Sequence, residues 1–370
     1  MGARDSELPN LGEIDRGLKD FQRRTAAAVF HRLYEQARST HRFLVADEVG
    51  LGKTLIARSV IARTLHHLWD RVDRIDIVYI CSNANIARQN IKRLNVLGDE
   101  GKTLPTRITL LPIMLRDLNK NRINFISFTP GTSFDLKSNL GVAPERMLLY
   151  WLLKDIWHFS GSAPMNVFQG MSGAKRFRQQ LKYFPDNNQI DRTLAKEFRK
   201  TVREHVREEK DKGEWTLRER FDWLCQEYRR SDSRITREAR LERSAFVGKL
   251  RSLLAETCVR MLEPDLVILD EFQRFKHLLS GEDDASVLAR KLFEYSDDLT
   301  AVRVLLLSAT PYKMYTLSDE SDDEDHYRDF IDTLGFLFRD KQKVEKFADL
   351  LREYRYELLR FNDQSPDQLE

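Results

Sequence analysis

Two glycines, a lysine and a threonine follow one another between an apolar run and a helical pattern, in the stretch Gly50-Leu-Gly-Lys-Thr54. Glycines let backbone N–H groups turn toward an anion, and the positive end of the following helix faces the same anion. Lys53 would then reach the β and γ phosphates of a nucleotide, and the Thr54 hydroxyl would bind Mg²⁺. The strict phosphate-loop pattern has glycine where this chain has Asp47, so the stretch alone leaves open a glycine-rich turn with a chance Lys-Thr pair.

A pair of carboxylates far along the chain is a second candidate for phosphate chemistry. The apolar run Leu266-Val-Ile-Leu predicts a buried strand, and it ends in Asp270 and Glu271. A carboxylate at the C-terminal end of such a strand can hold the Mg²⁺ that bridges nucleotide phosphates, and its neighbour can polarise the attacking water. Paired acids at strand ends also occur as helix caps, but here they share a chain with a glycine-rich loop.

A third apolar run, Leu305-Leu-Leu-Ser-Ala-Thr-Pro311, ends in small hydroxyl residues and a proline. Ser308 and Thr310 are the kind of groups that can sense the state of neighbouring carboxylates. Taken alone, the same residues would describe an ordinary capped strand end. The motif therefore indicates a phosphate site only in combination with the other two motifs.

These motifs need a scaffold that brings strand ends together, and the apolar pattern predicts one. Short apolar runs alternate with helical patterns, which is typical of a parallel sheet covered by helices on both faces. Right-handed crossovers make this a doubly wound α/β domain. The expected strands are 42–46, 75–81, 108–113, 123–128, 266–269 and 302–307. The expected helices are 18–34, 55–69, 85–94, 244–262, 327–338 and 344–361.

The stretch 138–262 differs from the rest, because it has few strand signals and many charged and aromatic residues at helical spacing. Residues 171–260 hold 23 Lys and Arg against 15 Asp and Glu, whereas the whole chain has a net charge of only +3. We interpret 138–262 as a basic helical insertion between two parts of the α/β domain, 1–137 and 263–340, with a helical segment, 341–370, at the end. The cations of the stretch 138–262 would suit contacts with DNA or with a protein partner, although a charged helix face is more often simply solvated.

The composition is that of a globular chain, since 41% hydrophobic residues can form a core and 32% charged residues lie below the range of disordered proteins. Cys81, Cys225 and Cys258 lie far apart without metal-ligand spacing, which favours reduced thiols. The chain begins without an apolar leader, and its longest apolar stretch, 147–153, is too short to cross a bilayer. We therefore expect a cytoplasmic protein without a membrane partner.

In their order along the chain, the three motifs resemble motifs I, II and III of superfamily-two helicases and translocases. The form Asp47-Glu-Val-Gly-Leu-Gly-Lys-Thr54 is similar to that of the Swi/Snf-like translocases on double-stranded DNA, the RapA-like proteins among them, in which an aspartate also stands at the position of Asp47. The resemblance covers about 17–134 and 263–338 and does not explain the insertion. It implies a first RecA-like lobe that uses ATP and Mg²⁺.

The resemblance also implies roles for single residues. Gln22 matches an upstream glutamine that reads adenine, and Glu271 matches the catalytic base. Gln273 completes an Asp-Glu-Phe-Gln box, less usual than the Asp-Glu-Ala-His form, and together with Ser308 and Thr310 it would couple the state of ATP to movement. The implied nucleotide-binding set is Gln22, Val49, Gly50, Leu51, Gly52, Lys53 and Thr54, the implied Mg²⁺ ligands are Thr54 and Asp270, and the implied catalytic residues are Lys53, Asp270 and Glu271.

Two further loops stand where the family places its nucleic-acid motifs Ia and Ib. They are Cys81-Ser-Asn-Ala-Asn-Ile-Ala-Arg-Gln89 and Ser127-Phe-Thr-Pro-Gly-Thr-Ser133. Loop hydroxyls, amides and an arginine suit phosphate oxygens, which give grip without sequence preference. The same residue types are equally common as turn and cap residues. The candidate nucleic-acid contacts are Ser82, Asn83, Arg88, Thr129 and Gly131.

Motors of this family hydrolyse ATP between two RecA-like lobes, and the second lobe supplies arginines to the nucleotide. Only 60 residues follow Thr310, too few for that lobe, so we expect a fragment or one subunit of a split motor. Because an arginine finger contributes about 10³–10⁵ in rate, the chain alone is expected to be a weak ATPase. The alternatives are a strand-separating DNA or RNA helicase, and a nucleotide-gated module that binds DNA or a partner without productive turnover. By family analogy only, such motors often serve restriction-like antiviral defence.

Overall fold

The computed structural model describes most of the chain in ten stretches. They are residues 8–37, 39–47, 50–96, 107–114, 120–134, 139–187, 190–229, 235–296, 301–308 and 326–363. Two of the predicted site residues, Val49 and Thr310, lie outside the described residues, and so does the side chain of Arg88.

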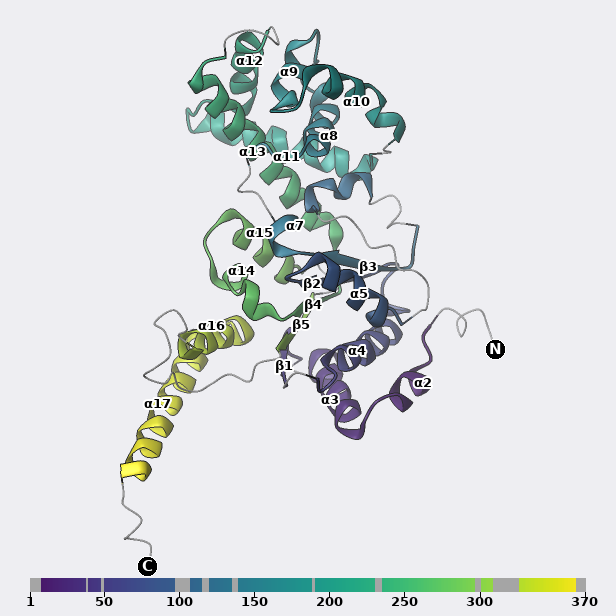
Figure 1. The fold of residues 1–370 in the computed structure, drawn as a ribbon, viewed down its shortest axis with the longest axis vertical. Helices are drawn as coiled ribbons and strands as arrows, with labels where there is room; N and C mark the ends of the chain where they lie inside the picture. Colours follow the sequence, from purple (N-terminus) through teal and green to yellow (C-terminus); the bar gives the residue numbers. More distant parts are fainter. Residues whose placement is uncertain are drawn as a thin grey trace, which may run out of the picture.

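A five-stranded sheet forms the centre of the α/β part (Figure 1). Its strands are β1 (Arg42–Ala46), β2 (Ile75–Cys81), β3 (Ile123–Phe128), β4 (Leu266–Asp270) and β5 (Arg303–Ser308). Every neighbouring pair is parallel, and the order is β1-β5-β4-β2-β3. After β1 the chain forms β2 and β3 at the opposite edge of the sheet. It then returns to form β4 and β5, which lie between β2 and β1. The prediction of a doubly wound parallel α/β fold with a helical interruption is confirmed.

Helices cover both faces of the sheet, because successive strand residues point to opposite sides and both sides are apolar. Ile77 and Tyr79 belong to one core, whereas Val78 and Ile80 belong to the other. The first core includes α3 (Asp20–Phe30), α4 (Lys53–Leu68) and α5 (Ala84–Leu94), and α2 (Leu11–Arg16) packs against α4 outside it. The second includes α13 (Arg237–Leu262), η3 (Phe272–Phe275), α14 (His277–Ser280) and α15 (Asp284–Phe293).

Residues 108–113 form a 3₁₀ helix, η2 (Ile108–Ile113), so the strand expected there was wrong. Pro112 has no N–H to donate to a strand ladder. Ile108 and Leu111 are buried against α13 instead of joining the sheet. Other differences concern element ends: α13 begins at Arg237 and not near 244, and the first expected helix is α3 followed by one π-helical turn, η1 (His31–Glu35).

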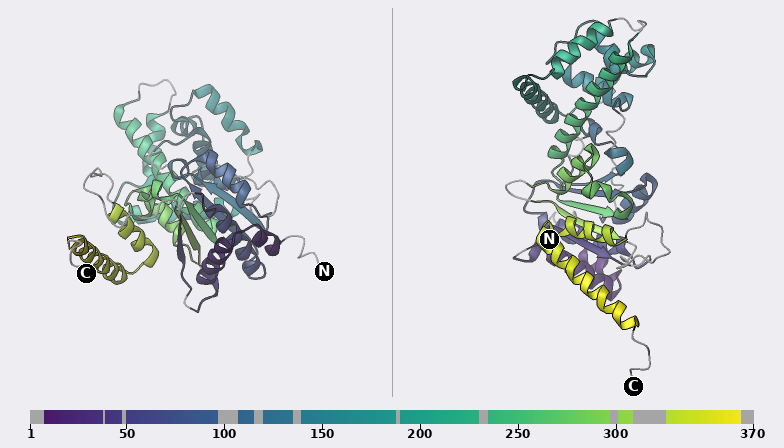
Figure 2. Two further views of the ribbon diagram at one scale, coloured as in Figure 1. Left: turned by 60° about the horizontal axis from the view of Figure 1, so that its bottom comes forward. Right: turned by 90° about the vertical axis from the view of Figure 1, so that its left-hand side faces the viewer.

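A helical region between β3 and β4 forms one end of the molecule (Figures 1 and 2). We call this region, residues 139–262, the insertion. Its helices are α8 (Ala143–Lys154), α9 (Ala163–Gln169), α10 (Ala174–Asn187), α11 (Arg192–Asp211), α12 (Leu217–Glu227) and α13. Aromatic rings fill its centre, where Phe221 contacts Trp157, Phe168 and Phe246. The insertion therefore has a core of its own.

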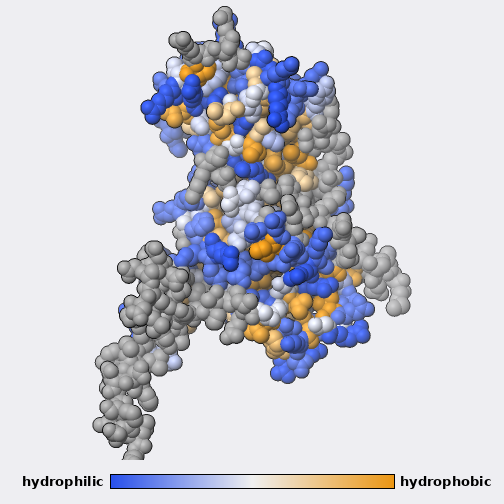
Figure 3. Space-filling model, in the orientation of Figure 1, coloured by the Kyte–Doolittle hydropathy of each residue, from blue (hydrophilic) through white to orange (hydrophobic). Residues whose placement is uncertain are grey.

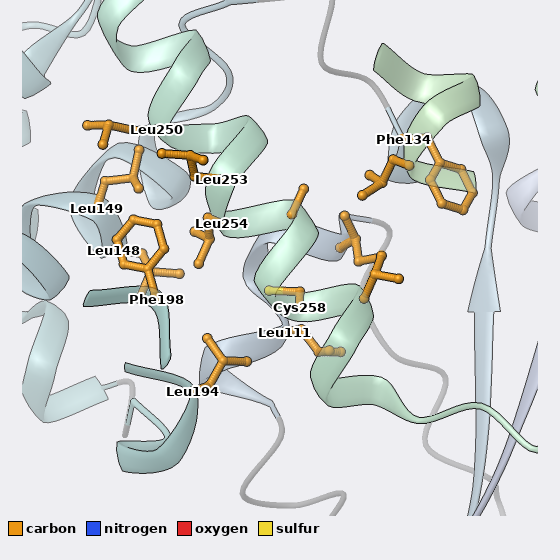
Figure 4. Close-up of a cluster of buried hydrophobic side chains, with 14 of the residues drawn as sticks. Leu111, Phe134, Leu148, Leu149, Leu194, Phe198, Leu250, Leu253, Leu254 and Cys258 are labelled. Atoms are coloured by element: carbon orange, nitrogen blue, oxygen red, sulfur yellow. The ribbon is translucent and has the colours of Figure 1, made fainter. Parts of the chain in front are cut away.

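Helix α13 connects that core to the core beside the sheet. Its Leu250, Leu253 and Leu254 lie among leucines of α8 and Phe198 of α11, and further along the same helix Cys258 lies near Leu111 of η2 (Figure 4). All of these residues belong to one continuous hydrophobic cluster. The insertion is thus packed onto the α/β part and not merely linked to it.

A buried ion pair between two helices of the insertion lies beside this junction and accepts one hydrogen bond from η2. Glu145 of α8 and Arg251 of α13 are 0% and 1% exposed, and Arg251 donates from Nε and from a terminal nitrogen to Glu145 Oε1 at 3.1 and 3.0 Å. The hydroxyl of Thr109 in η2 donates to the same oxygen, and the N–H of Val142 donates to the other at 2.7 Å. Buried charges are tolerated when they are paired and hydrogen-bonded in this way.

The C-terminal helices follow at the edge of the sheet that β1 forms. Helix α16 (His326–Phe338) packs beside β1, where the guanidinium of Arg42 stacks on the Phe336 ring at 3.8 Å, and α17 (Lys341–Asp363) extends from α16 (Figure 2). Hydrophilic residues are spread over the face drawn in Figure 3, with apolar residues among them. None of the helices in the described stretches is both long and apolar enough to span a membrane.

Candidate functional site

The carboxyl ends of all five strands meet at one edge of the sheet, because every strand runs in the same direction. In the strand register Ala46 lies opposite Ser308, Leu307 opposite Asp270, and Asp270 opposite Cys81. The loops that follow these residues hold the three sequence motifs and the loop of motif Ia. Ligands of open α/β sheets bind outside this edge, so the fold brings the predicted residues to the expected place.

The glycine-rich loop leads directly into α4. Gly50 and Gly52 have φ of 87° and 82°, a left-handed conformation that favours glycine, and Gly52 is the N-cap of α4. Lys53 is the first residue of the helix and only 9% exposed, and its ammonium donates to the carbonyl oxygen of Asp47 at 3.0 Å. The ammonium of Lys53 thus contacts the residue at which the loop begins, while Lys53 itself stands at the positive end of α4.

Gln22 of α3 holds this loop through its side-chain amide. Its Nε2 donates to the carbonyl oxygen of Leu51 at 2.8 Å, and its Oε1 accepts from the N–H of Lys19 at 2.9 Å. A Cβ added at Gly52 would clash with Nε2 of Gln22. Gln22 is therefore placed against the loop, while its contact with adenine stays a prediction.

Asp270 ends β4 and is 8% exposed. The hydroxyl of Tyr79 on β2 donates to its carboxylate, and the amide of Asn90 on α5 donates to the same oxygen at 3.2 Å and to the Tyr79 oxygen at 2.8 Å. Burial raises the pKa of the Asp270 carboxyl above its usual range, against the lowering effect of these two donors. The positive charge of Lys53 also lowers this pKa.

Sequence reasoning missed Tyr79 and Asn90. One signal was present, because Tyr79 places a hydroxyl inside an otherwise apolar strand, and a buried tyrosine hydroxyl usually finds a hydrogen-bond partner. Asn90 gave no signal, since an amide on an amphipathic helix is ordinarily a surface residue. Its contact with Asp270 depends on how α5 packs beside β2.

Glu271 turns the chain sharply after β4. Its φ and ψ of 53° and 44° are left-handed, a conformation that non-glycine residues adopt at a cost and that is concentrated at functional sites. Its N–H donates to the carbonyl oxygen of Leu307 at 3.0 Å, which ties the turn to β5. Asp270 is buried and Glu271 is half-buried, so the adjacent carboxylates differ in their access to solvent.

Ser308 connects the three motifs. Its carbonyl oxygen accepts from the N–H of Asp47 at 3.2 Å, and its hydroxyl accepts from Nε2 of Gln273. The other end of the Gln273 amide, Oε1, is buried and has no hydrogen-bond partner in the described part of the chain. Buried polar atoms are normally paired, so Oε1 is an acceptor available to a ligand or water.

The predicted nucleic-acid residues are placed less uniformly. Ser82 and Asn83 are exposed, and Asn83 caps α5 by accepting from the N–H of Asn85 at 2.8 Å. Thr129 is buried, which does not suit a surface contact with a phosphate, whereas Gly131 in the short helix α7 (Pro130–Ser133) is exposed. Helix capping accounts for Asn83, which is one of the interpretations that the sequence left open.

The residues at this edge fit a nucleotide with Mg²⁺. The space beside Gly50 is open, with no atom within 4 Å of an added Cβ, so a phosphate has room next to the loop. Lys53 offers a cation, Thr54 a hydroxyl at the start of α4, and Asp270 a carboxylate whose burial a divalent cation would offset. This is the donor set that Mg²⁺–nucleotide sites use.

Comparisons of the chain with protein families, with characterised proteins and with solved structures found no match. The resemblance to superfamily-two motors therefore rests on the motif residues, and function has to be argued from the site.

Proposed function

We propose that this chain is the ATP-binding motor lobe of an ATP-dependent translocase on double-stranded DNA, of the Swi/Snf-like branch of superfamily two. The observation that carries the proposal is that the glycine-rich loop before α4 and Asp270 at the end of β4 lie at the same edge of one parallel sheet. Lys53 and Asp270 lie far apart in the sequence, yet the fold brings them to one sheet edge, where the lysine charge acts on the carboxyl group. A phosphate loop and a metal-binding carboxylate need this proximity to share one nucleotide.

Each residue then has a task that suits its chemistry. Lys53 and the N–H groups of the glycine-rich loop would hold the phosphates, and Thr54 and Asp270 would hold Mg²⁺, which supplies charge neutralisation when bound. Glu271 would orient and polarise the attacking water. A second RecA-like lobe, in the same chain or another, would supply the arginines, so turnover by this lobe alone is slow.

The proposal also gives a use to the contacts around Ser308. Movement requires that a change at the phosphates reaches another part of the lobe. Ser308 contacts the start of the phosphate loop through Asp47 and the segment after the carboxylate pair through Gln273. A shift of either motif on hydrolysis would therefore displace the other. The free, unbridged thiols of Cys81, Cys225 and Cys258 support a cytoplasmic setting.

Nucleotide binding is the first test. Isothermal calorimetry with Mg²⁺ and a non-hydrolysable ATP analogue is expected to show binding by the wild-type chain and at least a tenfold loss, roughly 1.4 kcal/mol, in Lys53→Ala and in Asp270→Asn. Asp76→Asn is a matched control, because Asp76 is also a buried strand aspartate but stands at the opposite end of β2. Unchanged binding in both site variants, or an equal loss in the control, contradicts the proposal.

Motor activity is the second test and needs both lobes. With a second RecA-like lobe present, duplex DNA is expected to stimulate ATP hydrolysis, and Glu271→Gln is expected to abolish hydrolysis while ATP still binds. Displacement of a triplex-forming strand without separation of the duplex indicates translocation. Duplex separation would favour the helicase alternative, and full biological activity of Glu271→Gln would favour a nucleotide-gated binding module.

A further inference from the structure

The exposed side of α11 carries a regular row of cations, and we infer that this row is a contact surface for the phosphate backbone of double-stranded DNA. The inference rests on the proposed function and deepens it by naming a surface that would bind the DNA duplex along which the motor moves. The row, called here the α11 stripe, consists of Lys196, Lys200, Arg203, Arg207 and Lys210. Its spacing of four, three, four and three residues places all five side chains on one side of the helix.

The stripe faces solvent, away from the core of the insertion. Helix α11 packs against α13 and α8 (Figure 1) through a different side, which includes Leu194, Phe198 and Val202. All five stripe residues are exposed, and within the described stretches none of them forms an ion pair. Their charges are therefore available to a partner.

Other arginines of the insertion are used differently. Arg199 donates to the carbonyl oxygen of Leu152 at 2.8 Å and pairs with Asp155, which fixes α11 against the end of α8. Arg220 pairs with Glu242 at 2.5 Å. These cations hold the insertion together, so the excess positive charge of this region is not spread evenly but includes one row that folding leaves unused.

The exposed charges on α11 form two neighbouring rows, one of cations and one of carboxylates. Within the stripe, Lys196 and Lys200 stand four residues apart, as do Arg203 and Arg207, and like charges at this spacing repel. The acidic residues of the helix stand mostly one position further along, about 100° around the axis. They are Glu197, Glu204, Glu208 and Asp211, whereas Glu209 is buried and accepts from the N–H of Leu217. A polyanion lying along the stripe would relieve the repulsion among its cations.

The length and chemistry of the stripe favour duplex DNA over an acidic protein. From Lys196 to Lys210 a helix rises about 21 Å, and a duplex of that length carries on the order of 12 phosphate charges. No residue on the exposed surface of α11 is a large apolar one, and protein partners usually need such anchors. An evenly spaced row of cations on a rigid helix gives grip without sequence preference, which suits a motor that moves along any sequence.

The experiment compares two variants of the full chain that lose the same charge. In the stripe variant all five residues become Gln. In the control variant five other exposed cations of the insertion become Gln, namely Lys175, Arg176, Lys182, Arg229 and Arg240. Binding of a 30-base-pair duplex of mixed sequence is measured by fluorescence anisotropy over a series of KCl concentrations, with the Mg²⁺–nucleotide affinity as a check on folding.

The stripe variant is expected to bind at least tenfold more weakly at low salt, and its plot of log K against log [KCl] is expected to be less steep by about 4–5, since each of the five lost phosphate contacts contributes about 0.9. The control slope is expected to change by less than about 1. A third variant, Glu204→Gln with Glu208→Gln, is expected to bind more tightly. Equal losses in the stripe and control variants, or no loss in the stripe variant, overturn the inference alone. A wild-type chain that binds no duplex at any salt concentration removes the DNA part of the proposed function as well.

Discussion

The hydroxyl of Tyr79, on β2, donates a hydrogen bond to the carboxylate of Asp270, at the end of β4. Asn90 of α5 donates to both oxygens of this contact, so three elements converge on one carboxyl group. The loop between β2 and α5 holds Ser82 and Asn83, two of the predicted nucleic-acid contacts. The proposed metal ligand is thus held by the strand and the helix that flank the proposed DNA-binding loop.

Replacing Tyr79 by Phe is expected to weaken the metal-dependent part of nucleotide binding. Loss of a partner that orients a metal ligand typically costs about 10–100-fold in metal affinity. Titration of Mg²⁺ at fixed nucleotide should therefore require more Mg²⁺ in Tyr79→Phe, while binding of the nucleotide in EDTA stays unchanged. Tyr228→Phe is the control, because the Tyr228 hydroxyl also donates inside the protein, to the carbonyl oxygen of Ala239 at 3.4 Å. The same Mg²⁺ dependence in both variants would contradict a role for Tyr79 in positioning Asp270.

Replacing Gly52 by Ala is expected to reduce nucleotide affinity more than its effect on stability explains. The left-handed conformation costs a non-glycine residue about 1–2 kcal/mol, and the new Cβ would also meet the Gln22 amide. Gly213→Ala is a matched control, since Gly213 has φ of 70° but no atom within 4 Å of an added Cβ. Calorimetry of nucleotide binding and urea unfolding measure the two effects separately.

The clash at Gly52 can be relieved by shortening its partner. Adding Gln22→Ala to Gly52→Ala is expected to restore part of the lost stability, while nucleotide affinity stays low, because Leu51 has then lost the donor that holds its carbonyl group. If Gly52→Ala and Gly213→Ala bind nucleotide equally well, contact between Gln22 and the loop has no part in forming the site.

Much of this arrangement could be predicted from the sequence, because parallel strands place their carboxyl ends together. The positions of Lys53, Asp270 and Ser308 at one edge follow from three apolar runs and their order. The contacts of Asn90 and the burial of Thr129 depend on how helices pack, which no local pattern encodes. The error at 108–113 has the same origin, since an apolar run with Pro112 at its end is buried by α13 and not by a neighbouring strand. The α11 stripe was visible only as an excess of charge until the burial of the helix was known.

Asp76 gives a prediction for the dependence of stability on pH. Burial raises the pKa of this carboxyl to about 6, despite the lowering effects of Arg74, whose guanidinium lies 2.7 Å away, and of the amide of Asn124. Between about pH 4 and 6 the folded chain therefore binds more protons at Asp76 than the unfolded chain does. The contribution of Asp76 to the free energy of unfolding is present below this window and falls as pH rises through it, by on the order of 3 kcal/mol.

Urea unfolding of the wild-type chain and of Asp76→Asn between pH 4 and 7.5 isolates this effect, because all other groups titrate in both. The free energy of unfolding of the wild type minus that of the variant is expected to decrease up to about pH 6 and then to stay level. A difference that increases with pH would mean that attraction to Arg74 outweighs burial.

The buried pair of Glu145 and Arg251 gives the last prediction, on the junction of the insertion with the sheet. Arg251→Met is expected to lower the free energy of unfolding by about 3–5 kcal/mol, because it leaves the Glu145 charge buried without its main partner. Adding Glu145→Gln removes that charge and keeps one acceptor oxygen for the Val142 N–H, while the Thr109 hydroxyl can accept from the new amide NH2, so the double variant should be more stable than Arg251→Met alone. The exposed pair of Arg218 and Asp222 is the control, and its removal is expected to cost less than about 1 kcal/mol. Urea unfolding of the wild-type chain and of these three variants is the measurement, and a double variant less stable than Arg251→Met would contradict the idea that the unpaired Glu145 charge destabilises Arg251→Met.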